Sequence, residues 1–284
     1  MSLPRRDFLK LGSLAAVGLA SPLRAKDEIE LPTLPYSVGV QTYTFREFDL
    51  EPMLQRTKAL GLKAGEFYSK HIPPNSTPAQ LAAIKKLCAE YGVKPISFGV
   101  QGFSKNHDAN AKFFDFAQEL GVGTISADPD PDSFDSLDKL VDKTKIAIAI
   151  HPHGPAGGGK LHRWYSAESI MKAVKDHHPL IGSCLDTGHL IRAAQLGAKL
   201  DPAEQVRVMG DRNFGMHLKD HDNAKNTDVV FGKGVLNVPS ILKALADVKF
   251  KGYIAIEYEA NPKDPSPDVK ACLEVFRDAV AKKA

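Results

Sequence analysis

The sequence predicts an α/β protein that folds as a (β/α)8 barrel of the TIM type, and three observations support this prediction. From Tyr36 onward, eight short apolar runs alternate with stretches that have helical spacing. No long linker interrupts this alternation. The last four runs each lead into a histidine, an aspartate or a glutamate. Repeated βα units favour a parallel sheet, and eight of them close into a barrel whose functional side chains gather at the C-terminal ends of the strands.

The expected strands are short, and apolar residues recur at helical spacing in the stretches between them. The strands are expected at Val38–Tyr43, Leu62–Phe67, Pro95–Val100, Thr124–Ala127, Ile146–Ile150, Gly182–Asp186, Phe214–Leu218 and Tyr253–Glu257. The clearest helical stretches are Pro78–Tyr91, Ala109–Leu120 and Ser166–His178. An open, doubly wound sheet is the alternative architecture. It is disfavoured because Gly39-Val40-Gln41 stands where such a sheet carries its Gly-x-Gly-x-x-Gly motif.

The first 25 residues are predicted to be an export signal of the twin-arginine type. Arg5 and Arg6 precede Phe-Leu-Lys, an apolar run extends from Leu11 to Ala20, and small residues follow as far as Ala25. A basic start, an apolar middle and a small-residue end are typical of a secretory signal, and paired arginines are typical of the twin-arginine route. The apolar run falls well short of the roughly 20 residues that span a bilayer. We therefore expect a periplasmic protein without a membrane anchor, with residues 26–284 as a single barrel domain.

Charge and cysteine content exclude several classes of protein. The chain has a net charge of +3, and segment 1–25 holds four basic residues and one acidic residue, so the remainder carries 33 of each. A nucleic-acid-binding protein shows a basic excess, and the balanced charge argues against a nucleic-acid partner. The three cysteines are Cys88, Cys184 and Cys272. Their number and spacing fit neither a disulfide framework nor a zinc motif.

The fifth and eighth strands share a pattern that places polar residues inside the barrel mouth. The fifth reads Ile-Ala-Ile-Ala-Ile-His-Pro-His over 146–153, and the eighth reads Ile-Ala-Ile-Glu-Tyr-Glu over 254–259. Successive strand side chains point to opposite faces. With the isoleucines directed at the outer helices, His151, His153, Glu257 and Glu259 face inward. The alanines between them are expected to leave the barrel axis open below a polar mouth.

The sixth and seventh strands end in the same way, and the four strands together predict a metal site. Asp186 closes the sixth strand and His217 lies inward near the end of the seventh. With His151 and Glu257, these residues are spaced by 35, 31 and 40 positions, about one βα unit each. Two imidazoles and two carboxylates at one depth form a mixed nitrogen and oxygen site for one divalent ion. Manganese is the first candidate, with zinc, cobalt, iron and magnesium as alternatives.

Several segments carry a resemblance to a known family. They read Gly-Val-Gln-Thr-Tyr-Thr-Phe at 39–45, Cys-Leu-Asp-Thr-Gly-His at 184–189 and Met-His-Leu-Lys-Asp at 216–220, with Gly-Lys-Gly at 232–234 and Ile-Glu at 256–257. Together they resemble the sugar phosphate isomerase/epimerase group of xylose isomerase-like TIM barrels, over nearly all of residues 36–284. In that family a Glu, an Asp, a His and a second Glu hold one metal. Asp186, His217 and Glu257 match this set, whereas His151 replaces the first Glu.

The resemblance also implies catalytic roles near the barrel mouth. In the family's ketose epimerases, two metal-bound glutamates exchange a proton across the two faces of the sugar. With His151 in place of one of them, only Glu257 remains as the expected general base, and simple two-glutamate epimerisation is disfavoured. His153, His189 and Glu66 match positions on the substrate side in the family and are added as catalytic candidates.

Two further segments near the mouth allow alternative interpretations. Lys219 is expected to point outward, or else to pair with Asp220 or a neighbouring carboxylate. The run Gly157–Gly159 is either a mobile lid or a long turn. It lacks the Lys-Ser/Thr pair of a phosphate loop, and an unphosphorylated substrate is therefore favoured.

The leading functional prediction is a metal-dependent isomerase or epimerase that acts on a sugar or cyclic polyol by proton transfer next to a carbonyl. A lyase or hydratase acting on 3-keto-glycosides is the alternative within the same fold. A non-catalytic sugar-binding barrel with a structural metal is the alternative of another class. A relative of the apurinic-site endonucleases is disfavoured by the neutral charge of residues 26–284. Fold alone does not separate the first three, and in each the partner is a small-molecule sugar or keto-sugar.

Overall fold

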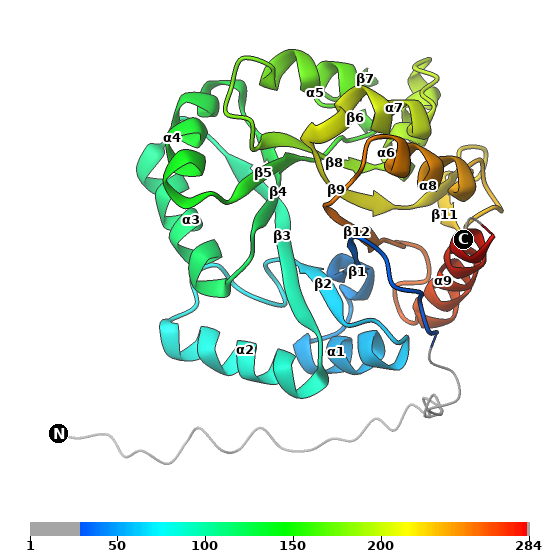
Figure 1. Ribbon diagram of the computed structural model, residues 1–284, viewed down its shortest axis with the longest axis horizontal. Helices are drawn as coiled ribbons and strands as arrows, with labels where there is room; N and C mark the ends of the chain where they lie inside the picture. The colour runs from blue at the N-terminus through cyan, green and yellow to red at the C-terminus, as the bar shows by residue number, and fades with distance from the viewer. Residues whose placement is uncertain (1–28, 283–284) are drawn as a thin grey trace.

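The computed structural model describes residues 29–282, in which eight parallel strands close into a barrel in the order β1-β12-β9-β8-β5-β4-β3-β2 (Figure 1). The strands are β1 Ser37–Gln41, β2 Ala64–Phe67, β3 Lys94–Phe103, β4 Thr124–Pro129, β5 Ala147–Ile150, β8 Ile181–Asp186, β9 Asn213–Leu218 and β12 Tyr253–Ile256. Two short hairpins lie outside the barrel, formed by β6 Pro155–Ala156 with β7 Lys160–Leu161, and by β10 Asp220–Asp222 with β11 Thr227–Val229. The predicted (β/α)8 fold is confirmed.

The helices surround the strands (Figure 1). They are α1 Leu50–Ala59, α2 Pro78–Tyr91, α3 His107–Leu120, α4 Phe134–Thr144, α5 Ala167–Val174, α6 Thr187–Arg192, α7 Pro202–Met209, α8 Val238–Asp247 and α9 Ser266–Ala281. The bounds of α2 agree with the prediction because local capping chemistry sets them. Thr77 and Gln80 form a capping box, Pro78 takes the first helical position, and Gly92 ends the helix in the left-handed conformation.

The first two strands are shorter than predicted. β1 ends at Gln41 because the Gln41 side chain accepts a hydrogen bond from the Tyr43 N–H at 3.0 Å and caps a short 3-10 helix, Thr42–Phe45. β2 begins at Ala64, two residues later than predicted. Both changes lie at strand ends and leave the order of the barrel unaffected.

A tyrosine fills the barrel axis, where the alternating isoleucines and alanines predicted an open space. Tyr253 clusters with Ala149 and Cys184 in a small buried apolar group inside the barrel. Gly215 makes room for it, because a Cβ at this position would lie 2.5 Å from the Tyr253 Cζ atom. Ile148, in contrast, belongs to the main core between strands and helices. The Tyr253 side chain therefore packs the barrel interior below the mouth.

The other predictions about chain class have different outcomes. All three cysteines are buried and free. Among residues 29–282, no helix is long and apolar enough to cross a membrane. The predicted export signal, residues 1–25, lies outside the described residues.

The carboxylate of Asp220 organises the loop that precedes α8. Asp220 is buried, and it accepts hydrogen bonds of 2.9–3.0 Å from the backbone N–H groups of His221, Gly232, Gly234, Val235 and Leu236. A Cβ at Gly234 would lie 2.3 Å from the Asp220 Oδ1 atom, so this position requires glycine. The Gly-Lys-Gly segment of the sequence therefore wraps around a carboxylate of the protein itself.

We expect Asp220→Asn to destabilise the protein by about 3 kcal/mol, because an amide group would face several buried backbone donors with only one acceptor oxygen. Urea unfolding measures the loss. Trypsin should also cut faster at Lys233, which is exposed within the loop.

Asp222→Asn is the matched control, because Asp222 is partly exposed, accepts from the backbone N–H groups of Ala224 and Lys225, and forms an ion pair only with the exposed Lys225 side chain among the described residues. Asp222→Asn should lower the free energy of unfolding by less than about 1 kcal/mol. Equal losses in the two variants, or unchanged cleavage at Lys233 in Asp220→Asn, would contradict this role of Asp220.

Candidate metal centre

Four strands bring His151, Asp186, His217 and Glu257 together at the C-terminal mouth of the barrel. Asp186 at the end of β8 is the register partner of His217 in β9. His217 in turn pairs with Ala255 of β12, two residues before Glu257. His151 directly follows β5, and its N–H donates to the Ala127 carbonyl at 2.8 Å. These four side chains point into the barrel, as strand parity predicted.

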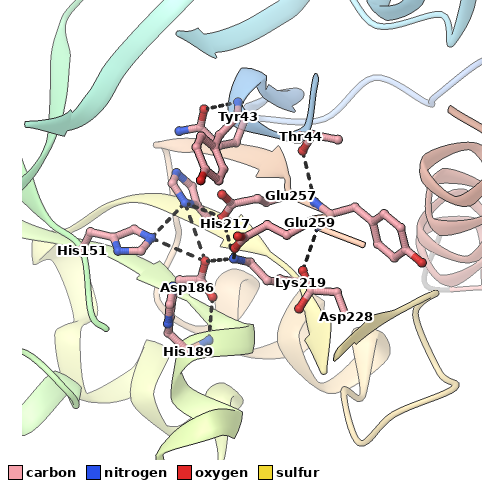
Figure 2. A network of polar contacts seen from close by, with 12 residues as sticks. Tyr43, Thr44, His151, Asp186, His189, His217, Lys219, Asp228, Glu257 and Glu259 are labelled. Carbon is pink, nitrogen blue, oxygen red and sulfur yellow. Dashed lines mark hydrogen bonds and ion pairs between the residues drawn. The ribbon is translucent and has the colours of Figure 1, made fainter. Parts of the chain in front are cut away.

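The ligand atoms of the four residues lie within 4.8 Å of one another, and all four residues are buried. The His151 Nε2 atom is 3.4 Å from Asp186 Oδ2 and 3.0 Å from His217 Nδ1. The His217 Nδ1 atom is 3.2 Å from Glu257 Oε2. A metal bonded at about 2.0–2.2 Å spaces its neighbouring ligand atoms by about 3–4 Å. Figure 2 shows these side chains pointing toward one another.

Unsatisfied atoms in this cluster fit a divalent cation. Asp186 Oδ2 and Glu257 Oε2 are buried and accept no hydrogen bond, so the single ammonium group of Lys219, 3.3 and 3.0 Å away, is shared between two buried carboxylates. Two imidazole nitrogens, of His151 and His217, also face each other at 3.0 Å. A cation between these four atoms would satisfy both oxygens and both nitrogen lone pairs. The buried His/Asp/Glu cluster is therefore consistent with a divalent-metal site.

Glu66 lies behind His217, away from the cavity at the mouth. Its Oε1 atom accepts from the His217 Nε2–H at 2.9 Å and from Gln41 Nε2 at 2.7 Å, and its Oε2 atom accepts from the Tyr253 hydroxyl. Burial alone would raise the pKa of Glu66, but His217 and the Tyr253 hydrogen bond lower it. The carboxylate thus fixes the tautomer that leaves His217 Nδ1 free for the cluster. A substrate-side role, expected for Glu66 from the sequence, does not fit this position.

Lys219 points into the barrel mouth, so the prediction that it faces outward is wrong. It stands two residues after His217 and therefore has the same parity, which the sequence interpretation overlooked. Its Nζ atom lies 3.0 Å from Glu257 Oε2, 3.3 Å from Asp186 Oδ2 and 2.6 Å from Glu259 Oε1. Burial opposes the ammonium charge, but these carboxylates raise the pKa of Lys219 well above its ordinary value. The alternative prediction, an ion pair with neighbouring carboxylates, is the one confirmed.

The Asp-Thr-Gly-His and His-Leu-Lys-Asp segments interlock around Lys219. The Thr187 hydroxyl accepts from the Lys219 N–H at 2.8 Å and donates to the Lys219 carbonyl at 2.6 Å. Gly188 leaves room for the lysine stem, because a Cβ there would lie 2.6 Å from the Lys219 Cδ atom. The Asp186 side chain then caps α6 by accepting from the His189 N–H at 2.7 Å. The two motifs are thus parts of one packed unit.

A cavity of about 360 Å³ opens above the cluster. Its lining includes the polar residues Gln41, Ser69, Gln101, His151, His153, His189, Arg192, Glu257 and Glu259. The aromatic and small residues of the lining are Tyr43, Tyr68, Phe98, Gly99 and Val100. A mixed lining of this kind suits a small ligand that carries both polar and apolar groups. Sequence reasoning missed the aromatic residues and Arg192, because they lie outside the strand-end pattern on which it relied.

His153 and His189 face this cavity as neutral imidazoles. Burial, together with the neighbouring His151 and His162, lowers the pKa of His153 to about 2. Burial lowers the pKa of His189 well below its ordinary value. The Gly154 N–H donates to His189 Nδ1 at 2.9 Å, which leaves the proton of neutral His189 on Nε2. Both rings are therefore able to exchange hydrogen bonds with a ligand.

Comparison with known proteins identifies the family. Residues 54–279 match the family model described as a xylose isomerase-like TIM barrel. The chain belongs to this family. No curated protein matches the chain in sequence.

Solved structures share the fold at low sequence identity. An uncharacterised protein from Parabacteroides distasonis is 28% identical, with a TM-score of 0.66, and the match covers 86% of this chain and 99% of that one. D-psicose 3-epimerase from Clostridium cellulolyticum is 15% identical, with a TM-score of 0.67 and the same coverage. L-ribulose 3-epimerase is also 15% identical, with a TM-score of 0.66 and coverage of 87% and 97%. For the two epimerases, the similarity establishes the shared fold alone.

We expect Lys219→Met to destabilise the metal-free protein by about 3–5 kcal/mol, because it removes a buried counter-charge from three carboxylates. With manganese present the loss should be smaller, since the dication then neutralises Asp186 and Glu257. Urea unfolding in a chelator and in excess manganese measures both values.

Lys225→Met removes an exposed ion pair with Asp222 and is the control, with an expected cost below about 1 kcal/mol in either condition. If Lys219→Met costs the same with and without manganese, Lys219 and the ion do not share the same carboxylates.

Proposed function

We propose that this protein is a divalent-metal-dependent isomerase or epimerase acting on a sugar or cyclic polyol by proton transfer next to a carbonyl. One observation carries the proposal: His151 and Glu257 belong to the buried cluster and also line the cavity. A ligand in the cavity therefore lies directly against the cluster. Membership of the xylose isomerase-like family and the fold shared with sugar 3-epimerases add support.

The side chains around the cavity have distinct roles in this proposal. His151, Asp186, His217 and Glu257 would hold one ion, with manganese as the first candidate and zinc, cobalt, iron or magnesium as alternatives. Such an ion, when bound, polarises a carbonyl group and stabilises negative charge on its oxygen. Glu257 lines the cavity and accepts the proton from the carbon next to the carbonyl. His153 and His189 orient the sugar through hydrogen bonds.

The replacement of a family glutamate by His151 favours a second candidate, a lyase or hydratase acting on 3-keto-glycosides. Two-glutamate epimerisation requires a carboxylate on each face of the sugar. In this cavity the imidazoles of His151, His153 and His189 line the wall together with Glu257, and His151 stands where the family carries its other glutamate. Elimination needs one base and one hydrogen-bond donor to the leaving group, and Glu257 with His189 meets this requirement. Both candidates begin with the same proton abstraction.

We also propose that the protein works in the periplasm. The support is the twin-arginine pattern of residues 1–25. The twin-arginine route carries folded proteins, so the ion would be bound before export.

Purified protein loaded with manganese should contain about one ion per chain, and Asp186→Ala or His217→Ala should lose it. Glu66→Gln should retain the site but weaken affinity by about 10- to 100-fold, because it disturbs the partner that orients His217. Elemental analysis after dialysis at graded manganese concentrations measures all four proteins. Full occupancy in both alanine variants would rule out this ligand set.

The protein should catalyse exchange of a carbon-bound hydrogen of a keto-sugar with deuterium from the solvent, with manganese present. Glu257→Gln should slow this exchange by about 10²–10⁴-fold while most of the metal is retained, because the amide still offers one oxygen. Mass spectrometry follows the label, and net conversion distinguishes isomerisation from elimination.

Glu259→Gln distinguishes the roles of the two carboxylates that follow β12. A larger loss of exchange rate in Glu259→Gln than in Glu257→Gln would assign the base to Glu259. If the exchange rate and the metal content fall together in Glu257→Gln, Glu257 is a ligand only. Absence of exchange with every keto-sugar tested, in metal-loaded protein, would favour a non-catalytic sugar-binding barrel.

A further inference from the structure

Arg192 is a cation of the cavity wall that lacks a counter-ion. It lies at the end of α6 and lines the cavity with His153 and His189. Its Nε atom is buried without a hydrogen-bond partner. Within residues 29–282, its guanidinium forms neither a hydrogen bond nor an ion pair. A guanidinium group carries five donors, and leaving them unpaired in a partly buried position is unfavourable.

The other cations near the mouth already have partners. Lys219 is surrounded by three carboxylates. Arg163 lies 3.0 Å from Asp128 and 3.1 Å from Asp130. Arg46 donates to the Glu259 carbonyl at 2.6 Å. Arg192 therefore differs from its neighbours in having its positive charge available to a ligand.

The backbone around Arg192 is arranged to hold the arginine stem close to His189. A Cβ added at Gly154 would lie 3.0 Å from the Arg192 Cβ and 3.4 Å from His189 Nδ1. Glycine at position 154 thus lets the strand-to-hairpin segment pass directly against α6. The Gly154 N–H fixes the His189 ring, and Arg192 lines the cavity wall beside it.

We propose that Arg192 binds an anionic group of the substrate, so that the sugar is a sugar acid with its carboxylate at the Arg192 end of the cavity. This inference rests on the proposed function, since it names the substrate class of the same site. A planar guanidinium matches a carboxylate with two parallel hydrogen bonds. The carboxylate end at Arg192 leaves the carbonyl end to meet Glu257 and His151.

A carboxylate fits this position better than a phosphate. Phosphate sites combine several cations with a cradle of backbone N–H groups or a helix N-terminus. Here Arg192 is the one cavity-lining cation of the described residues without a partner, and it stands at the C-terminal end of α6. A single guanidinium suffices for a carboxylate.

The test compares three ketohexoses that differ only at C6, namely D-fructose, D-fructuronate and D-fructose 6-phosphate. Calorimetric titration into manganese-loaded protein gives the dissociation constant of each. We expect D-fructuronate to bind about 10- to 100-fold more tightly than D-fructose, the range for a hydrogen bond to a charged group. Arg192→Met should abolish this preference, whereas Arg192→Lys should retain part of it. Metal content should be unchanged in both variants.

Arg163→Met is the matched control, since it removes an arginine near the same mouth whose charge is already neutralised by Asp128 and Asp130. It should leave the preference for D-fructuronate intact. Circular dichroism and metal content of every variant verify the fold.

Each outcome decides the proposal. Equal affinity for D-fructose and D-fructuronate, or an unchanged preference in Arg192→Met, overturns it, while the proposed function stands if a neutral sugar binds and exchanges deuterium. If only D-fructose 6-phosphate binds tightly, the ligand of Arg192 is a phosphate and not a carboxylate, and the proposal is overturned. If none of the three sugars binds to metal-loaded protein, the proposal fails and the proposed function loses its sugar substrate as well.

Discussion

Charge balance at the barrel mouth is the constraint on which the rest of the site depends. Four carboxylates gather there, those of Glu66, Asp186, Glu257 and Glu259, and the first three are almost fully removed from water. Burying a charge costs several kcal/mol unless a partner compensates it. The compensation comes from Lys219, from the donors around Glu66 and from a position suited to a dication. Because these partners follow different strands, closure of the barrel and neutralisation of the charges depend on each other.

The fold is predictable from the sequence because each βα unit repeats the same short-range pattern. The bounds of α2 are predicted correctly, since a capping box and a final glycine are local signals. β1 ends early because the Gln41 side chain captures the Tyr43 N–H, and strand periodicity is insensitive to such a contact. Tyr253 has the same parity as Glu257, but the sequence interpretation expected open space on the barrel axis. Only three-dimensional packing shows that Gly215, on the neighbouring strand, makes room for its ring.

The candidate site is predictable where strand parity decides it and less so elsewhere. The convergence of the cluster residues follows from alternation, and so does the inward position of Lys219 once its two-residue distance from His217 is counted correctly. Glu66 has the expected inward parity, but parity does not show that His217 would lie between it and the cavity. Arg192 lies on a helix, where strand parity does not apply. Its three-residue spacing from His189 was the signal present in the sequence.

If Arg192 binds the substrate carboxylate as proposed, the short helix α6 also sets the distance between that carboxylate and the metal cluster. Asp186 caps the helix, His189 stands one turn on, and Arg192 ends it, so a cluster residue and the arginine are separated by about 9 Å of helix axis at roughly 1.5 Å per residue. Three-residue spacing keeps neighbouring members on one side. A compound whose carboxylate and reacting carbon are closer together or farther apart than this distance would contact either Arg192 or the cluster, but not both. In this proposal, insertion of one whole turn into α6 would move the guanidinium about 5 Å farther from the cluster and would leave the residues of the cluster unchanged.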